Sequence, residues 1–234
     1  MKKFSIIIPT LNHLFDCLRP CVESIIKFTD LSDVEVIIVG NGCTDKTREY
    51  VLSLYDMPGA TFKYVELDEP AGYPKAINAG LKIAEGEYIV LLNNDTVLMG
   101  QEKNTWLNIL VDPFSIVPNC GITGPVKRRL HHLGEDFIIF FCVMIAKKVF
   151  DDIGHLDEIF YPGSGEDIDF CIRASRKGYA LVQAPYNGTI TQSGEYMTGN
   201  FPIFHAGEKT VHEISNWSEI FDRNMNIVND RYKR

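Results

Sequence analysis

The chain has 234 residues, of which 45% are hydrophobic and 23% charged, a composition typical of a folded domain with an apolar core. This length fits a single domain, and the net charge of −8 disfavours nucleic acid as a partner because a polyphosphate backbone would be repelled. No apolar run approaches the roughly 18 residues that suggest a membrane-spanning helix, so we expect no membrane span.

Strands and helices alternate over the first hundred residues. We expect strands over 5–8, 34–39, 62–67 and 88–92, and helices over 14–28, 46–54 and 73–84. Short β-branched apolar runs are typical of buried parallel strands, and the apolar spacing between the first two strands follows the helical period. Pro20 predicts that the regular helix begins close to it. This alternation predicts an α/β fold with a parallel sheet and helices on both faces.

The second half has a less regular pattern. We expect a strand over 137–145, a helix over 147–153, a helix over 167–177 closed by Gly178, a long loop over 185–202 and a helical tail over 212–234. A loop of that length inside a compact domain often serves as a lid or binding loop. The tail is expected to pack on the outside of the domain.

Polar clusters follow three of the predicted strands, at residues 9–12, 40–45 and 93–95. In a parallel sheet the ligand binds beyond the carboxyl ends of the strands, which is where these clusters fall. Within Asn93-Asn94-Asp95, a carboxylate fixed at a strand end could hold a divalent cation that bridges the oxygens of a diphosphate. The alternative is an ordinary polar turn.

Two further segments could carry chemistry. In the run over 163–169, a carboxylate could accept the proton of an attacking hydroxyl group as a general base. The alternative is a helix start with Ser164 as N-cap and Asp167 completing a capping box. His205, shortly before Gly207, is either a metal ligand or an ordinary core or surface histidine.

Two patterns bear on partners and compartment. The only dense basic cluster is either a solvated loop or a contact for donor or acceptor phosphates; it consists of Lys127, Arg128, Arg129, His131 and His132. The six cysteines include no Cys-x-x-Cys pair, so we expect buried free thiols and a reducing, cytoplasmic compartment.

Taken in order, these segments resemble family 2 glycosyltransferases. The segments that carry the resemblance are SIIIPTLN (5–12), VGNGCTD (39–45), AINAG (76–80), LNNDT (92–96), GP (124–125), VFDDIGHLDE (149–158) and GEDIDFCIR (165–173). Each motif alone is weak, but the series spans roughly residues 4–180 in order and with ordinary spacing.

The resemblance implies a GT-A fold in one domain over 1–234 and an inverting transfer from a UDP-, dTDP- or GDP-linked sugar. The acceptor would be a hydroxyl group of a glycan, a lipid-linked molecule or a protein, with Mn²⁺ or Mg²⁺ as cofactor and a role in polysaccharide biosynthesis. Residues 1–96 would bind the nucleotide sugar, 97–210 the metal and acceptor, and 211–234 would form the helical tail. Peripheral membrane association remains open.

Carried over position by position, the resemblance assigns roles to individual residues. Asp167 would be the base, and Glu166 would position the acceptor or donor sugar. Asp95 and His205 would bind the metal ion, with Gln192 as a rival for the position of His205. The donor-binding residues would be Pro9, Thr10, Asn12, Asn41, Gly42, Gly72, Lys75, Asn78, Asn93 and Asn94.

Two departures from the family pattern affect these expectations. Gly40 stands where the family usually has an acid that reads the uracil or thymine imide, so Asn41 or a backbone carbonyl would have to substitute. The metal motif begins with Asn93 instead of Asp, a variant similar to that of rhamnosyltransferases. Two alternatives remain: a non-catalytic module that binds nucleotides or glycans, and a sugar nucleotidyltransferase.

Overall fold

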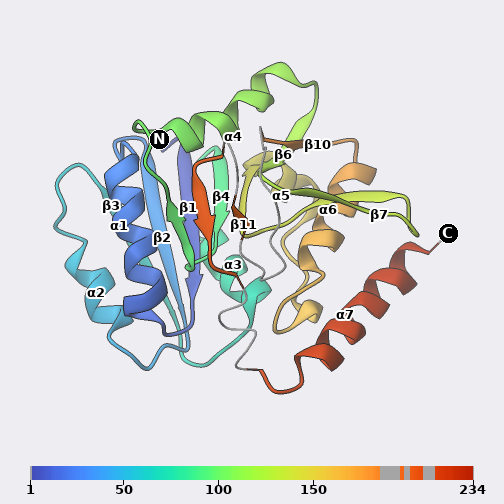
Figure 1. The fold of residues 1–234 in the computed structure, drawn as a ribbon, viewed down its shortest axis with the longest axis horizontal. Coiled ribbons are helices and arrows are strands. Elements are labelled where there is room, and N and C mark those ends of the chain that lie inside the picture. Colours follow the sequence, from blue (N-terminus) through green and yellow to red (C-terminus); the bar gives the residue numbers. More distant parts are fainter. Residues whose placement is uncertain (1, 185–195, 198–200, 208–213, 234) are drawn as a thin grey trace.

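A seven-stranded sheet forms the centre of the computed structural model, which describes residues 2–184, 196–197, 201–207 and 214–233 (Figure 1). In sheet order the strands are β10 (Ala180–Gln183), β6 (Cys120–Gly124), β9 (Cys142–Ala146), β4 (Tyr88–Leu92), β1 (Phe4–Thr10), β2 (Val34–Asn41) and β3 (Thr61–Leu67). Only β9 runs antiparallel to its neighbours, β4 and β6. The predicted mostly parallel sheet is therefore confirmed.

Helices cover both faces of this sheet (Figure 1). The helices are α1 (Arg19–Phe28), α2 (Thr47–Ser53), α3 (Tyr73–Leu81), α4 (Thr105–Ile116), α5 (Lys147–Ile153), α6 (Glu166–Arg176) and α7 (Trp217–Tyr232). Because side chains alternate along a strand, Ile6 and Ile8 pack with α1, α2 and α4, whereas Ile7 packs with α3, α5 and α6. The regular part of α1 begins at Arg19, after a π-turn (η1, Leu14–Leu18), which confirms the prediction made from Pro20.

Two small sheets flank the main one. In the first, β5 (Thr96–Leu98) pairs antiparallel with β12 (Ile203–His205), which also pairs with β11 (Tyr196–Met197). The second is the hairpin of β7 (Lys127–Leu130) and β8 (Glu135–Ile138). The β5–β12 pairing matters most, because it brings the chain near residue 205 back to the end of β4.

The single strand predicted over 137–145 is wrong, because the structure has two strands there. β8 pairs with β7 outside the main sheet, whereas β9 lies between β4 and β6 in it. Residues 139–141 connect the two strands, and both Phe140 and Phe141 line a cavity described below. The sequence does not show where one strand ends and the next begins, because every residue of this apolar run suits a buried strand.

The C-terminal helix packs on the outer side of α6, as predicted for the tail (Figure 1). A short 3₁₀ turn (η2, Glu158–Phe160) completes this cluster, in which Phe160 and Ile172 meet Val228 and Tyr232. Most of the loop predicted over 185–202 and the start of the predicted tail lie outside the described residues.

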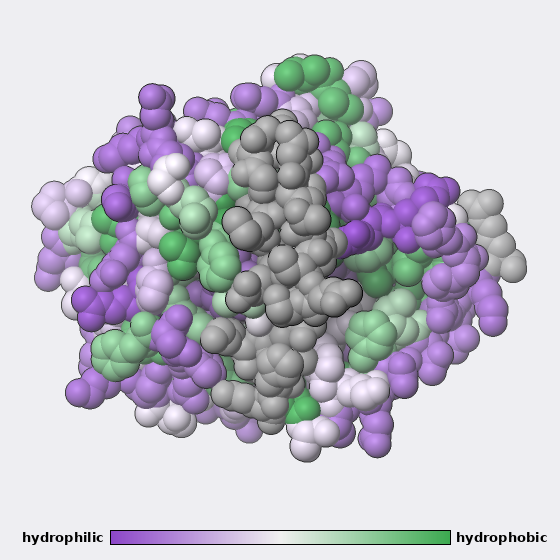
Figure 2. Space-filling model, viewed as in Figure 1, coloured by the Kyte–Doolittle hydropathy of each residue, from purple (hydrophilic) through white to green (hydrophobic). Residues whose placement is uncertain are grey.

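The described part of the chain contains no helix that is both long and apolar enough to cross a membrane. Hydrophilic side chains predominate on the described surface of the face in Figure 2, with smaller apolar patches among them. All six cysteines are free thiols, and five of them are buried, while Cys43 is half-buried.

Candidate active site

A cavity of about 370 Å³ opens where the carboxyl ends of β1, β2 and β4 meet the segment that leads into α6. It is lined by Pro9, Thr10, Leu11, Asn41, Pro70, Gly72, Tyr73, Asn93, Asn94, Asp95, Ile139, Phe140, Phe141, Pro162, Gly163, Ser164, Glu166, Asp167, His205, Gly207, Ile214 and Trp217. A pocket of this size at the carboxyl ends of parallel strands is the expected position of a ligand in an α/β sheet.

Asp95 and His205 face each other in this cavity, although 110 positions separate them in the sequence. The β5–β12 pairing sets His205 opposite Thr96, and the Ala206 amide donates to the Asp95 carbonyl at 3.0 Å. As a result His205 Nε2 lies 3.1 Å from Asp95 Oδ1. The imidazole stacks on the ring of Phe141, with 4.5 Å between ring centroids and 6° between the planes.

The donor atoms at this corner fit a divalent cation. Asp95 Oδ1 is buried, and although it lies close to His205 Nε2, it forms no hydrogen bond of proper geometry with any described residue. The buried Asn93 Oδ1 also accepts no hydrogen bond from any described residue. The side-chain nitrogen of Asn93, Nδ2, lies 3.5 Å from His205 Nε2. Carboxylate and amide oxygens suit Mn²⁺ or Mg²⁺, and an imidazole nitrogen beside them favours Mn²⁺. A cation would satisfy two buried oxygens that accept no hydrogen bond from the described residues.

Other parts of the cavity lining come from residues predicted to bind the donor. Asn94 Nδ2 donates to Thr10 Oγ1 at 2.9 Å, which ties the end of β4 to the end of β1. Asn41 Oδ1 accepts the Ala71 amide at 2.7 Å. Gly72 has a φ of 81°, and a Cβ atom there would come within 3.0 Å of Tyr161 and Pro162. This glycine lets the loop before α3 approach the loop before α6.

Four predicted donor-binding residues do not line the cavity: Asn12, Gly42, Lys75 and Asn78. Asn12 Oδ1 instead accepts the backbone amides of Thr44 and Asp45, at 2.8 and 3.2 Å. The Asn78 side chain is bonded to both backbone polar groups of Leu156, so it joins α3 to the chain before η2. In this structure these two side chains hold loops together. The segment with Gln192 lies outside the described residues.

Tyr64 explains the absence of a side chain at position 40. A Cβ atom on Gly40 would lie 2.1 Å from the Tyr64 hydroxyl oxygen and 2.8 Å from its ring carbon Cζ. An acid at position 40 therefore requires Tyr64 to move. Burial raises the pKa of Tyr64 to about 12, so the phenol stays neutral at physiological pH.

Glu166 and Asp167 begin α6 and line the same cavity as Thr10 and Asn41. The N-cap is Gly165, in a left-handed conformation with φ of 95°, and no side chain caps the helix. The alternative capping box with Ser164 as N-cap is therefore wrong. Asp167 Oδ1 accepts the Ile168 amide at 2.8 Å, while the buried Glu166 Oε2 has no hydrogen-bond partner among the described residues.

Burial raises the pKa of both carboxyl groups above the ordinary range. The effect is larger for Glu166, because the charge of the adjacent Asp167 adds to the desolvation. Backbone hydrogen bonds, among them those from Ile168 and Phe140, oppose the rise at Asp167. The pair therefore titrates in two steps, with Glu166 keeping its proton to higher pH. Repulsion between the two groups disfavours the state in which both are ionised.

Several cavity residues were not predicted from the sequence. Tyr73, Phe140 and Phe141 form an apolar wall, and Tyr73 Oη donates to the Phe140 carbonyl at 3.0 Å. Ile214 and Trp217 come from the tail, to which we assigned no site residue. The one signal in the sequence was the tryptophan itself, since an indole on a polar helix often contacts a partner or ligand.

The basic cluster does not line the cavity. Lys127 and Arg129 both pair with Asp136, at 3.0 and 2.9 Å, across the β7–β8 hairpin. His132 Nε2 lies 2.7 Å from Asn229 Oδ1 of α7. These contacts favour the interpretation of this segment as a solvated hairpin.

Comparisons with known proteins agree with this geometry. Residues 5–119 match the family described as Glycosyl transferase family 2. The chain is 26% identical over 217 residues to the uncharacterized protein y4gI of Sinorhizobium fredii, covering 78% of this chain and 23% of that protein. It is 26% identical over 218 residues to the O-antigen biosynthesis protein RfbC of Myxococcus xanthus, covering 77% of this chain and 16% of that protein. The chain thus spans less than a quarter of these relatives' length.

Among solved structures, the chain is similar to the mannosyltransferase PcManGT of Pyrobaculum calidifontis, solved in complex with GDP-Man and Mn²⁺. The TM-score is 0.65 at 20% sequence identity, and the match covers 78% of this chain and 55% of that protein. At this identity the likeness concerns the fold.

The raised carboxyl pKa values predict how Glu166→Gln changes stability with pH. A carboxyl group whose pKa is higher in the folded than in the unfolded state destabilises the fold progressively as pH rises above the unfolded value. Glutamine removes this penalty, so we expect the variant to have a higher melting temperature than the wild type at pH 8, by a few degrees, and a smaller difference at pH 5.

Thermal unfolding followed by circular dichroism at both pH values measures this effect. Glu219→Gln, an exposed change on α7, is the matched control and should leave the melting temperature nearly unchanged at both pH values. A Glu166→Gln protein that is less stable than the wild type at pH 8 would contradict the proposed burial penalty.

Proposed function

Because the chain belongs to glycosyl transferase family 2 and has the GT-A fold, we propose that it transfers a sugar from a nucleoside diphosphate sugar to a hydroxyl group of an acceptor. One observation carries the proposal. A single cavity contains a corner that fits a divalent cation, formed by Asp95 and His205, and a carboxyl pair suited to proton transfer, Glu166 and Asp167. A cation can stabilise the departing diphosphate, and a carboxylate can take the proton of the attacking hydroxyl group.

On the donor side, Asp95 and His205 would hold the cation, with the Asn93 amide oxygen close by. A bound Mn²⁺ or Mg²⁺ supplies positive charge that stabilises a departing diphosphate. The protein would hold the ligands of the cation in place. The β5–β12 pairing fixes the backbone at His205, and stacking on Phe141 fixes the imidazole ring. Thr10 and Asn41 would contact the nucleoside at the ends of β1 and β2.

On the acceptor side, Asp167 would act as the general base. The acceptor oxygen attacks the anomeric carbon, the bond from that carbon to the diphosphate oxygen breaks, and the hydroxyl proton passes to Asp167. Such a single displacement inverts the anomeric configuration. Asp167 suits this role because burial raises its pKa to about 6, so it is ionised yet basic at neutral pH.

Glu166, which stays protonated to higher pH, can donate a hydrogen bond to the acceptor or donor sugar. A protonated carboxyl group beside an ionised one is a common way for an enzyme to keep two acids in different roles. Its unpartnered Oε2 atom supports a contact that forms when substrate is bound.

The nucleotide and the acceptor are further proposals. We infer a UDP-, dTDP- or GDP-linked hexose or deoxyhexose as donor, and a glycan, lipid-linked molecule or protein as acceptor. A role in polysaccharide biosynthesis is supported by the similar O-antigen biosynthesis protein. The absence of disulfides among the six cysteines supports a reducing compartment such as the cytoplasm.

Asp167→Asn tests the role of the base. The amide keeps the size of the side chain but cannot accept the proton, so we expect turnover to fall by roughly 10²- to 10⁴-fold while nucleotide binding stays near the wild-type value. Release of free nucleotide measures turnover, and calorimetry measures binding. Asp112→Asn, an exposed change on α4, serves as control. Near-normal turnover by Asp167→Asn would rule out this base.

Asp95→Asn tests the cation corner. Removing the carboxylate should weaken the binding of a nucleoside diphosphate in the presence of Mn²⁺ by at least about tenfold, because the cation loses a negatively charged ligand. In the presence of a chelator, the variant and the wild type should bind the nucleotide equally weakly. Equal affinity of both proteins with Mn²⁺, measured by calorimetry, would count against Asp95 as a metal ligand.

A further inference from the structure

Helix α7 packs one face along the segment that leads into α6, here called the α6 entry segment (residues 163–169). The buried residues of α7 are Asn224, Val228 and Tyr232, spaced four apart, so they lie one above the other on a single helical face. Each contacts a different part of the α6 entry segment. The order of the contacts along α7 follows the order of the residues along the segment.

The first contact is made by Asn224, whose side chain is fully buried. Its Nδ2 donates to the carbonyl groups of both Gly163 and Ser164, each at 2.9 Å. Its Oδ1 accepts from Arg223 Nε at 3.0 Å. Every polar atom of this amide is therefore used, and both of its N–H groups point at consecutive carbonyl groups of one loop.

The loop at this point has an unusual backbone. Ser164 and Gly165 follow each other in the left-handed region, with φ of 75° and 95°. For serine this conformation is unfavourable and persists only where surrounding contacts enforce it. The two hydrogen bonds from Asn224 hold the carbonyl groups on either side of the Ser164 α-carbon, so they fix the conformation from which Glu166 and Asp167 project.

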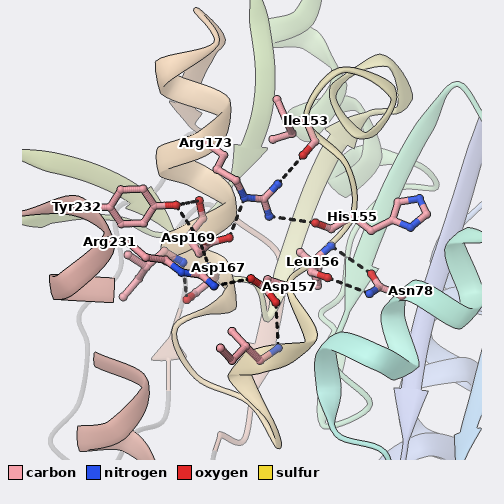
Figure 3. Close-up of polar contacts among 12 residues, drawn as sticks. Asn78, Ile153, His155, Leu156, Asp157, Asp167, Asp169, Arg173, Arg231 and Tyr232 are labelled. Atoms are coloured by element: carbon pink, nitrogen blue, oxygen red, sulfur yellow. Dashed lines mark hydrogen bonds and ion pairs between the residues drawn. The ribbon is translucent and has the colours of Figure 1, made fainter. Parts of the chain in front are cut away.

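The other two contacts lie on either side of the carboxyl pair. A Cβ atom on Gly165 would lie 3.5 Å from Val228 Cγ2, so α7 packs directly over the N-cap of α6. Tyr232 Oη donates to Asp169 Oδ1 at 2.6 Å, and Arg231 donates to the same oxygen at 3.0 Å. Figure 3 shows both side chains reaching Asp169 from α7, with Arg173 on its other oxygen.

From this arrangement we propose that Asn224 is a positioning residue, through which α7 holds the Glu166 and Asp167 carboxyl groups in the orientation that the transfer reaction needs. The proposal rests on the proposed function of that carboxyl pair. Packing alone does not account for Asn224, because a leucine at a buried helix position stabilises a protein without the cost of burying an amide. The amide adds directional bonds to two particular carbonyl groups.

The experiment compares Asn224→Asp with Asn226→Asp. Aspartate has the shape of asparagine and keeps an oxygen for Arg223, but it has no N–H group for the Gly163 and Ser164 carbonyls. Asn226 is exposed on the same helix, so its variant carries the same charge change without the contacts. Three quantities are measured: turnover of a nucleotide sugar, affinity for the nucleoside diphosphate with Mn²⁺, and amide hydrogen exchange.

For Asn224→Asp we expect kcat to fall by roughly 10- to 100-fold, because small displacements of a reacting group are costly. Nucleotide affinity should stay within about twofold of the wild type, and hydrogen exchange should speed up at residues 163–169 but not in β1 or β4. Asn226→Asp should match the wild type in all three. The proposal is overturned if Asn224→Asp keeps the wild-type kcat, or if kcat and nucleotide affinity fall together.

Tyr232→Phe covers the case in which Asn224→Asp does not fold. It keeps the ring packing and removes only the hydroxyl group that donates to Asp169. We therefore expect a two- to tenfold lower kcat with faster amide hydrogen exchange at residues 166–169. Wild-type values for both would overturn the proposal. Failure of the proposed function itself is distinguishable, because then no donor is turned over even by the wild type, while hydrogen exchange still reports whether Asn224 holds the segment.

Discussion

The burial of two adjacent carboxyl groups, Glu166 and Asp167, is the constraint on which the site depends. Desolvation raises both pKa values, and repulsion between the groups raises that of Glu166 further. Burying the two carboxyl groups lowers the stability of the fold. Ser164, just before them, has an unfavourable left-handed backbone conformation. Neither feature helps the chain to fold, but together they place two carboxyl groups with raised pKa values side by side in the cavity. Backbone strain and unsatisfied buried groups are expected where the structure is arranged for function.

The rest of the fold provides the surroundings of this pair. Parallel strands bring Thr10, Asn41 and Asp95 to one edge of the sheet, since their carboxyl ends all point the same way. The antiparallel β9 and the β5–β12 pairing then bring in groups from the second half, among them His205. The cavity is thus shared between the proposed nucleotide-binding residues in the first hundred positions and the proposed catalytic residues in the later ones.

The part of this arrangement that could be predicted from the sequence is the part set by local patterns. The alternation of strands and helices predicts the parallel sheet, and the polar clusters at 9–12, 40–45 and 93–95 mark the strand ends. What could not be predicted depends on contacts between distant segments. No local pattern reveals that His205 pairs opposite Thr96, that an apolar run splits at 139–141, or that Tyr64 occupies the space beside Gly40. The contacts of Asn224 on the buried face of α7 could not be predicted either, because the sequence of a helix does not show what the helix packs against.

The most direct test of the account is the release of free nucleotide from a panel of UDP-, dTDP- and GDP-linked sugars incubated with the wild-type protein. If the cavity binds a nucleotide sugar with the help of a cation at Asp95 and His205, one donor should be hydrolysed slowly in the presence of Mn²⁺ or Mg²⁺, and a chelator should stop the reaction. Hydrolysis that is unaffected by the chelator would contradict the role of the cation. No release from any donor, together with no nucleotide binding in calorimetry, would contradict the account as a whole.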